Sequence, residues 1–186
     1  MLQLNLQFAP ALQTERLVLR DLKETDIPQL FELRSNDELM RFIDRDKAQT
    51  EEDAKIFYQR LKSGQSDNTG ISWAVTLKGD DTMVGNIGFF NIQKEHHRAE
   101  LGYFLHPKYH RKGLMAEAIK AVTNFAFSDM NVHSIEANIN PENEASKKLL
   151  QKMGFVQEAY FRENFYFNGR FLDSAIYCLI VSDVMG

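Results

Sequence analysis

Residues 71 to 126 change from strand-type to helix-type patterning, and this change limits the fold more than any other feature of the chain. Three segments rich in β-branched and aromatic residues, 71–77, 83–92 and 99–105, follow one another across short polar turns, as in an antiparallel meander. Pro107 ends the third segment, and apolar residues then recur along one helix face as Leu114, Ala118, Val122 and Phe125 or Ala126. We therefore expect a sheet with helices packed against it.

The flanking segments extend this pattern in both directions. Strand-type stretches lie at 16–20, 134–139, 155–161 and 176–181, and helical stretches lie near 27–34, 39–42, 54–61 and 145–153. Local start and stop signals separate them: Thr25 or Asp26 as a helix cap, Thr50 with Asp53 as a capping box, Gly154 as a left-handed cap and Asn168-Gly169 as a hairpin turn. Because no repeat or linker interrupts the series, we predict one mixed-sheet α/β domain over residues 1–186.

Composition excludes several classes of protein. The chain has 186 residues, 44% of them apolar, with a net charge of -4, so it can bury a core but offers no overall basic surface for nucleic acid. The acidic balance mildly favours a cationic substrate. The single cysteine, Cys178, lies in an apolar run, which excludes an intrachain disulfide and indicates a buried strand thiol.

The termini carry no sign of export or membrane insertion. The N-terminus lacks the basic stretch and continuous apolar block of a secretory signal, and no run approaches the length needed to cross a bilayer. We expect a cytoplasmic protein without a membrane partner.

The segment from His110 to Glu117 has the features of an anion-binding turn. It leads from a strand into the central helix, whose first amides have no internal partners and lie at the positive end of the helix dipole. Gly113 allows a phosphate to approach the backbone, and Arg111 and Lys112 place cations beside it. Neither a triphosphate-binding loop nor a dinucleotide fingerprint matches this spacing. Taken alone, the segment fits a tight turn with two solvated basic residues equally well.

Several further motifs, taken together, resemble one family. They are Thr14-Glu15-Arg16-Leu17-Val18-Leu19-Arg20, Val84-Gly85-Asn86-Ile87-Gly88, Ala99-Glu100-Leu101-Gly102-Tyr103, Asn143-x-x-Ser146, Lys152-Met153-Gly154-Phe155 and Tyr166-x-Asn168-Gly169-x-x-x-Asp173. With the turn, they resemble the GNAT superfamily of acyl-CoA N-acyltransferases, and especially its ribosomal-protein N-acetyltransferases of the RimJ/RimL type. The resemblance implies a mixed sheet flanked by helices, largely antiparallel at the N-terminal side, with a parallel pair at the cofactor site.

The resemblance also implies acetyl-CoA as cosubstrate and assigns residues to it. The family pattern Q/R-x-x-G-x-G/A has His110 in its first place and Met115 in its last, departures that resemble the RimJ/RimL branch. Backbone amides would bind the pyrophosphate from Arg111, Lys112, Gly113, Leu114, Met115 and Ala116. The pantetheine arm would pair with the strand end at Tyr103, Phe104 and Leu105, and Asn143 would hydrogen-bond it.

Acetyl transfer to an amine needs one group that takes a proton and one that gives a proton. Ser146, which the resemblance places near the CoA sulfur, is the candidate acid, and Glu100 is the candidate base. The ordinary alternatives are a solvated or capping serine for Ser146, and for Glu100 the orientation of a substrate amine or a structural ion pair. Glu136, Glu158 and Glu163 are other candidate bases. Water can also suffice for a chain N-terminus, because an α-amine has a pKa of about 8 whereas that of lysine is about 10.4.

The resemblance alone implies the favoured acceptor, which is the N-terminal amine of a ribosomal protein. Transfer to a small amine such as a polyamine, amino acid or antibiotic is the alternative, and a non-catalytic acyl-CoA-binding module is a third interpretation. The histidine pairs His96-His97 and His106 with His110 do not have the spacing of a metal site, so no metal is expected. The net charge disfavours nucleic-acid binding through Arg111, Lys112, Lys147 and Lys148. The sequence does not set the oligomeric state, and a homodimer stays open.

Overall fold

The computed structural model describes residues 1–185 and contains one eight-stranded sheet with the strand order β1-β2-β3-β4-β5-β6-β8-β7. The strands are β1 (Leu12–Gln13), β2 (Leu17–Asp21), β3 (Ile71–Leu77), β4 (Asp80–Gln93), β5 (Arg98–Leu105), β6 (Ser134–Ile139), β7 (Val156–Phe167) and β8 (Arg170–Ile180). All neighbouring strands are antiparallel except β5 and β6. The predicted mixed α/β sheet with one parallel pair is confirmed.

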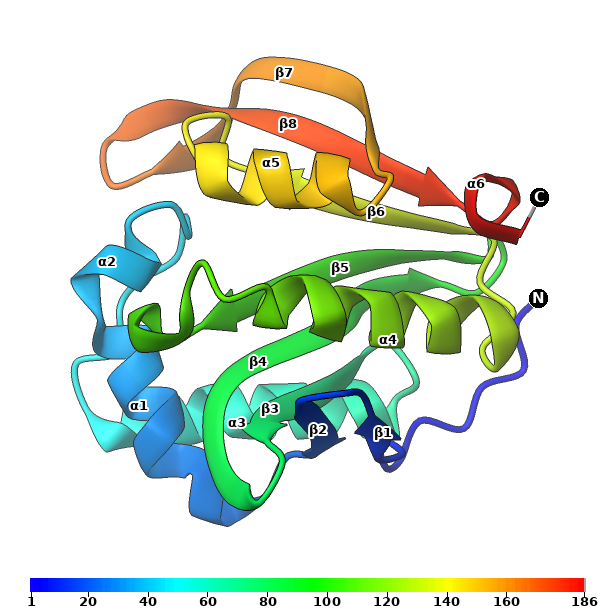
Figure 1. The fold of residues 1–186 in the computed structure, drawn as a ribbon. Coiled ribbons are helices and arrows are strands. Elements are labelled where there is room, and N and C mark those ends of the chain that lie inside the picture. The colour runs from blue at the N-terminus through cyan, green and yellow to red at the C-terminus, as the bar shows by residue number, and fades with distance from the viewer. Residues whose placement is uncertain (186) are drawn as a thin grey trace.

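Helices cover both faces of this sheet (Figure 1). They are α1 (Ile27–Ser35), α2 (Asp37–Met40), α3 (Glu51–Ser66), α4 (Leu114–Ser128), α5 (Glu144–Lys152) and α6 (Ser182–Met185), with short 3₁₀ turns at Glu24–Asp26 and Pro107–Tyr109. Helices α1 and α3 pack on one face through a cluster that includes Leu30, Phe57 and Leu61. Helix α4 packs on the other, and Leu150 of α5 joins the same cluster.

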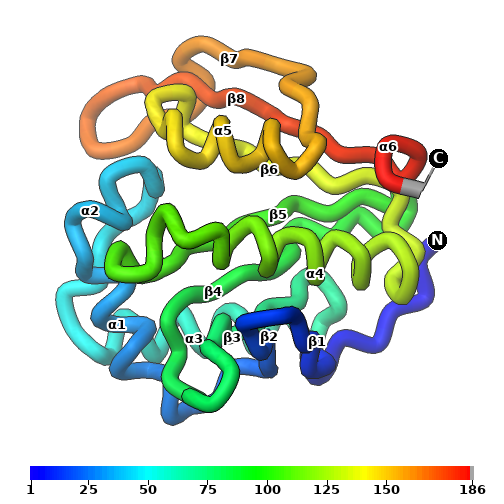
Figure 2. Tube along the Cα trace, in the orientation of Figure 1, coloured from blue at the N-terminus to red at the C-terminus, as the bar shows by residue number. Residues whose placement is uncertain are grey.

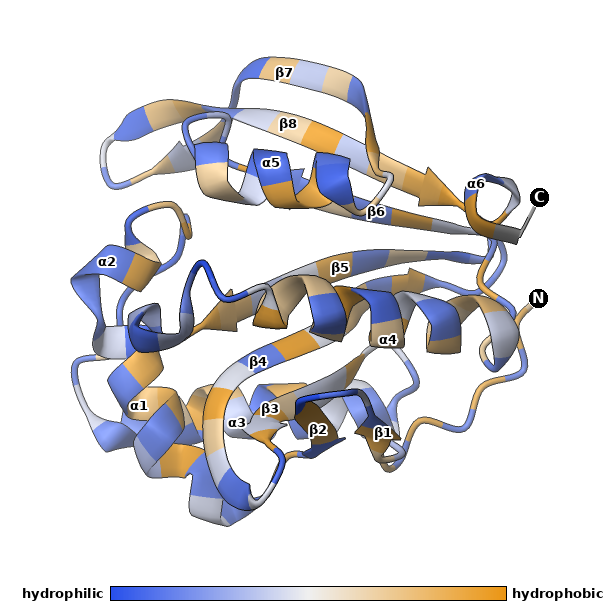
Figure 3. Ribbon diagram, viewed as in Figure 1, coloured by the Kyte–Doolittle hydropathy of each residue, from blue (hydrophilic) through white to orange (hydrophobic). Residues whose placement is uncertain are grey.

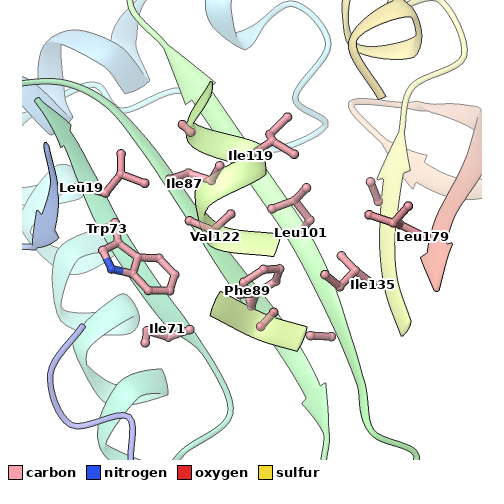
Figure 4. Close-up of a cluster of buried hydrophobic side chains, with 14 of the residues drawn as sticks. Leu19, Ile71, Trp73, Ile87, Phe89, Leu101, Ile119, Val122, Ile135 and Leu179 are labelled. Atoms are coloured by element: carbon pink, nitrogen blue, oxygen red, sulfur yellow. The ribbon is translucent and has the colours of Figure 1, made fainter. Parts of the chain in front are cut away.

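The main core lies between α4 and the centre of the sheet. Ile119 and Val122 of α4 face Trp73, Phe89 and Leu101 of three neighbouring strands (Figure 4), and all five are buried. Figure 3 shows the corresponding division of α4 into apolar and polar stripes. Since burying one such side chain contributes roughly 1.5–3 kcal/mol, this layer fixes the position of α4 against the sheet.

The parallel pair of β5 and β6 is short. Arg98, Ala99 and Glu100 of β5 are opposite Ser134, Ile135 and Glu136 of β6, and no pairing follows. The strands meet near the chain termini and separate toward α2 (Figure 2). From this point β6 pairs only with β8, so the sheet is parted in its middle.

Most of the predicted helix caps and turns are present in the structure. Thr50 and Asp53 form the predicted capping box at the start of α3, and Gly154, Asn168 and Gly169 have the left-handed backbone that their turns require, with φ of 87°, 47° and 80°. Some boundaries differ from the prediction. Strand β4 begins at Asp80, inside the predicted turn; β7 extends to Phe167; α2 ends at Met40, before Phe42; and the two-residue strand β1 was not predicted.

The cap predicted for α1 is also different. Asp26 occupies the N-cap position, but its side chain accepts no capping hydrogen bond from α1. Its carboxylate instead accepts two hydrogen bonds from the guanidinium of Arg20, at 2.8 and 2.7 Å, and one from the Lys23 backbone. Both side chains are buried, so a tertiary ion pair takes the place of the local cap and fixes the start of α1 to β2.

This ion pair yields a stability prediction. Asp26→Ala leaves the buried guanidinium of Arg20 without its two-bond partner, and we expect a loss of about 3 kcal/mol in the free energy of unfolding, measured by urea denaturation. The control is Asp37→Ala, which removes an exposed ion pair with Lys47 and should cost less than about 1 kcal/mol. Equal small losses in the two variants would contradict the importance of the Arg20 pair.

Candidate active site

A cleft of about 1520 Å³ opens where β5 and β6 part. Residues 101–105 of β5 and 137–139 of β6 line its two sides. The N-terminal end of α5, the turn before α4 and the α2–α3 region complete the lining. The parted strands therefore open into one continuous cleft that contacts most of the predicted site residues.

The edge of β5 that faces β6 has no strand partner from Leu101 to Leu105. An extended ligand with amide groups can hydrogen-bond to such an edge as an added strand does. The side chains here point to both faces: Tyr103 packs toward the α4 cluster, whereas the Phe104 ring lies 6.4 Å from that of Phe57 on α3. Tyr103, Phe104 and Leu105 are thus positioned to present backbone groups to a ligand in the cleft.

The turn before α4 has the geometry of an anion cradle. Arg111 and Gly113 both have a left-handed backbone, with φ of 58° and 76°, and residues of alternating handedness bring successive N–H groups into one concavity. Within residues 1–185, none of the amides from 111 to 116 donates to a protein acceptor. Leu114 and Met115 bury their side chains in the core, so only their backbone can face a ligand. Arg111, Gly113 and Ala116 also line the cleft, whereas Lys112 is not part of its lining.

The N-terminal segment supports this turn through contacts that the sequence did not reveal. The Glu117 carboxylate accepts hydrogen bonds from the Thr14 hydroxyl at 2.5 Å and from the Arg16 backbone and Nε, each at 2.7 Å. Arg16 Nη1 also donates to the Lys112 carbonyl at 2.8 Å. Burial acts to raise the pKa of Glu117, but these hydrogen bonds outweigh it and lower that pKa. The Thr14-x-Arg16 motif, which carried the family resemblance, therefore anchors the cradle.

Ser146 and Tyr103 meet across the parted strands. The Ser146 hydroxyl lies 2.7 Å from the Tyr103 hydroxyl, and Asn143 Oδ1 accepts the Ser146 N–H at 3.0 Å as the cap of α5. This cap occupies the Asn143 carbonyl and leaves its amide nitrogen available to a ligand. Burial raises the pKa of Tyr103 to about 12, and the hydrogen bond with Ser146 offsets part of this rise. The phenol therefore keeps its proton at neutral pH.

Of the four candidate carboxylates, Glu100 alone lines the cleft. Glu100 accepts a hydrogen bond from Asn91 Nδ2 at 2.6 Å; Asn91 lies at an irregularity of β4 and has a φ of 47°. Glu136 lines no part of the cleft and pairs with Arg98 instead. Glu158 and Glu163 lie on β7, also outside the lining. Since side chains alternate along a strand, Glu100 and Tyr103 are on opposite faces of β5.

Two histidines and the cysteine named in the sequence analysis contact or are buried by other parts of the protein. His110 contacts the Leu105 carbonyl at 2.6 Å, and His106 lies 3.2 Å from Glu32. Cys178 is buried, and burial raises the pKa of its thiol to about 11. In the described residues, no group of three or more His, Cys, Asp or Glu side chains is arranged to hold a metal ion. None of the helices that the structure describes combines the length and apolarity needed to span a membrane.

Most of the chain is similar in sequence to known proteins. Residues 16–156 match the family described as "Acetyltransferase (GNAT) domain". An uncharacterized N-acetyltransferase of Bacillus subtilis, YoaA, is 33% identical over 171 residues, which are 92% of this chain and 97% of the relative. The chain belongs to the GNAT acetyltransferase family. It is an acetyl-CoA-dependent N-acetyltransferase.

Two further relatives are named for different acceptors. The crystal structure of a ribosomal-protein-S5-alanine acetyltransferase from Vibrio fischeri superimposes with a TM-score of 0.81 at 25% identity and covers 92% of this chain and 97% of that one. A spermidine N(1)-acetyltransferase of Escherichia coli is 24% identical over 161 residues, which are 87% of this chain and 84% of the relative. The family is therefore established, and its named acceptors include both a protein and a polyamine.

The cradle is tested by placing a charge in it. Gly113→Asp adds a carboxylate at the turn, where a Cβ would lie 3.5 Å from Arg16 Nη2, and needs a left-handed backbone that aspartate adopts poorly. We expect acetyl-CoA binding to weaken more than about a hundredfold, since like charges brought together cost several kcal/mol. Isothermal titration calorimetry measures this change. Gly169→Asp, at a hairpin with a φ of 80° and open space around it, carries the same backbone strain and should bind normally. Unchanged affinity in Gly113→Asp would show that the cradle does not hold the phosphates.

Proposed function

We propose that this enzyme transfers the acetyl group of acetyl-CoA to the α-amine at the N-terminus of a protein, with ribosomal proteins as the favoured acceptor class. The observation that carries the proposal is the two-sided cleft, in which the Ser146–Tyr103 pair and Glu100 lie on opposite faces of β5. Its volume of about 1520 Å³ exceeds the range of roughly 300–1,000 Å³ typical of small-molecule pockets, so it has room for a cofactor arm and a peptide end. Similarity to the ribosomal-protein acetyltransferase supports the same acceptor class.

The residues present fit the cosubstrate. In this proposal the unpaired edge at Tyr103, Phe104 and Leu105 and the Asn143 amide nitrogen hold the pantetheine arm. The free N–H groups of residues 111 to 116 hold the pyrophosphate. When bound, acetyl-CoA supplies an activated acyl group as a thioester.

Proton movement divides between the two faces of β5. The acceptor nitrogen must lose one proton when it becomes an amide, and Glu100, directly or through a water molecule, is placed to take that proton. The departing thiolate must gain one, and Ser146 is placed to give it. Tyr103, hydrogen-bonded to Ser146, can resupply the serine because its own pKa of about 12 keeps it protonated.

An N-terminal acceptor requires only weak base catalysis. An α-amine with a pKa of about 8 is roughly one-tenth neutral at pH 7, whereas a lysine with a pKa of about 10.4 is neutral in fewer than about one molecule in a thousand. Glu100, or water alone, can therefore suffice for an α-amine.

The competing acceptor is a small amine such as a polyamine, amino acid or antibiotic, and the similarity to the spermidine acetyltransferase supports it. Membership in an acetyltransferase family removes the reason to prefer a non-catalytic acyl-CoA-binding module. We further propose one catalytic domain over residues 1–186, a cytoplasmic location, no nucleic-acid partner, no requirement for a metal and, as an open point, assembly as a homodimer.

An acceptor screen tests the proposal. Purified protein and acetyl-CoA are offered peptides with free N-termini, the same peptides with blocked N-termini, polyamines and amino acids, while release of the CoA thiol is followed and products are identified by mass spectrometry. Acetylation of free N-termini at the highest kcat/KM supports the proposal. Turnover confined to polyamines or other small amines would overturn the acceptor assignment.

The proton-donor pair gives a separate kinetic prediction. Ser146→Ala and Tyr103→Phe each remove one hydroxyl of the pair, and we expect kcat to fall by about a hundredfold while the Kd for acetyl-CoA changes less than about twofold. Tyr177→Phe removes a buried hydroxyl bonded to Gln157 at 3.0 Å and away from the cleft, so kcat should stay unchanged. Because an acid with a pKa of about 12 stays protonated below that pH, the wild-type kcat should not decline between pH 7 and 10. A normal kcat in both hydroxyl variants would exclude the pair from the reaction.

A further inference from the structure

Four arginines from α1, α3 and the segment after α2 line the cleft. Arg34 comes from α1, Arg41 and Arg45 from the segment after α2, and Arg60 from α3. Three carboxylates, Glu38, Asp44 and Glu100, line the same cleft. Arg34 and Arg60 pack with Phe57 on the face of the sheet opposite α4.

Arg34 is held in place without an acidic partner. Its guanidinium stacks 4.2 Å from the centroid of the Phe57 ring and donates to the Asp46 carbonyl at 3.1 Å. The guanidinium of Arg60 lies 5.2 Å from the same ring. In the part of the chain that the structure describes, no carboxylate comes within ion-pair distance of any of the four cleft arginines.

Three other arginines of the protein are neutralised by carboxylates, whereas Arg111, Arg162 and Arg170 have no ion pair among the described residues. Arg16 pairs with Glu117, Arg20 with Asp26, and Arg98 with Glu136. Arg34 instead has positive charges as its neighbours. Burial lowers the pKa of its guanidinium, and the positive charges of Arg60 and Arg45 lower that pKa further. A half-buried, stacked guanidinium surrounded by like charge is stabilised by any anion that enters, because a planar fork donates two hydrogen bonds to a carboxylate.

We propose that Arg34, supported by Arg45 and Arg60, binds an acidic side chain of the acceptor peptide and so selects protein N-termini that carry a nearby Asp or Glu. This inference deepens the proposed function and rests on it for the transfer step. The net charge of the chain favours a cationic substrate, but the local charge in the cleft is of the opposite kind. A polyamine would place its positive charges against these arginines.

The test uses CoA-bound enzyme and three amidated tetrapeptides that differ only at their second and third residues: Ser-Asp-Asp-Ala, Ser-Asn-Asn-Ala and Ser-Lys-Lys-Ala. Calorimetry gives Kd with CoA present, and steady-state kinetics with acetyl-CoA gives kcat/KM. We expect the acidic peptide to be preferred over the asparagine peptide by about tenfold in both quantities, as one charge-assisted pair contributes. The lysine peptide should be the poorest of the three, and added salt should reduce the preference.

Three variants locate the effect. Arg34→Gln should reduce the acidic preference to less than about twofold, and Arg34→Lys should keep part of it, since lysine retains the charge but not the stacked fork. Lys55→Gln removes a cation from α3 outside the cleft lining and should leave the preference intact. Thermal melting of each variant confirms folding, and the acetyl-CoA Kd should be unaffected.

The outcomes separate this inference from the proposed function. An acidic preference in Kd that depends on Arg34, with no acetylation of any peptide, would support the anion site and overturn the acceptor proposal. An equal preference in Arg34→Gln and wild type, or a preference for the lysine peptide, would overturn the anion site. Free glutamate is offered as a fourth acceptor; if it is bound and acetylated better than any of the three peptides, the carboxylate comes from a small acceptor and the assignment to a peptide is overturned.

Discussion

The short parallel contact between β5 and β6 is the constraint on which the rest of the site depends. Three residue pairs join the strands, and beyond Glu100 and Glu136 the sheet has two independent edges. The buried core on the α4 and α5 face contains residues of both halves of the sheet and keeps them in place, so the gap is part of the folded state. The free edge, the cleft and the cradle at the start of α4 all follow from this parting.

The parting also explains how one strand serves two chemical tasks. Successive side chains of β5 point to opposite faces, so Tyr103 meets Ser146 on the α4 and α5 side while Glu100 faces the arginine-lined side. In the proposed function, residues 100–105 therefore supply the candidate proton acceptor Glu100, the partner Tyr103 of the candidate donor Ser146, and a strand-like edge for the cofactor.

Sequence patterns predicted what local interactions decide. The order of elements, the Thr50–Asp53 capping box and the left-handed Gly154 and Asn168-Gly169 follow from neighbours a few residues apart. Contacts between distant segments were not predictable. They include the hydrogen bonds of Arg20 to Asp26, of Thr14 to Glu117 and between Tyr103 and Ser146. The overall charge likewise did not reveal the unpaired arginines in the cleft, since net charge does not record which residues the fold leaves unpaired. The roles of the individual site residues remain predictions.

Hydrogen exchange of single backbone amides, with and without acetyl-CoA, tests the central claim most directly. If the parted strand and the turn before α4 hold the cosubstrate, amides in segments 101–105 and 111–116 should exchange more slowly when it is bound, because bound acceptors then cover N–H groups that the protein leaves free. Amides of β3, which are already paired on both sides, should show no change. Protection elsewhere, with these two segments unaffected, would contradict the account.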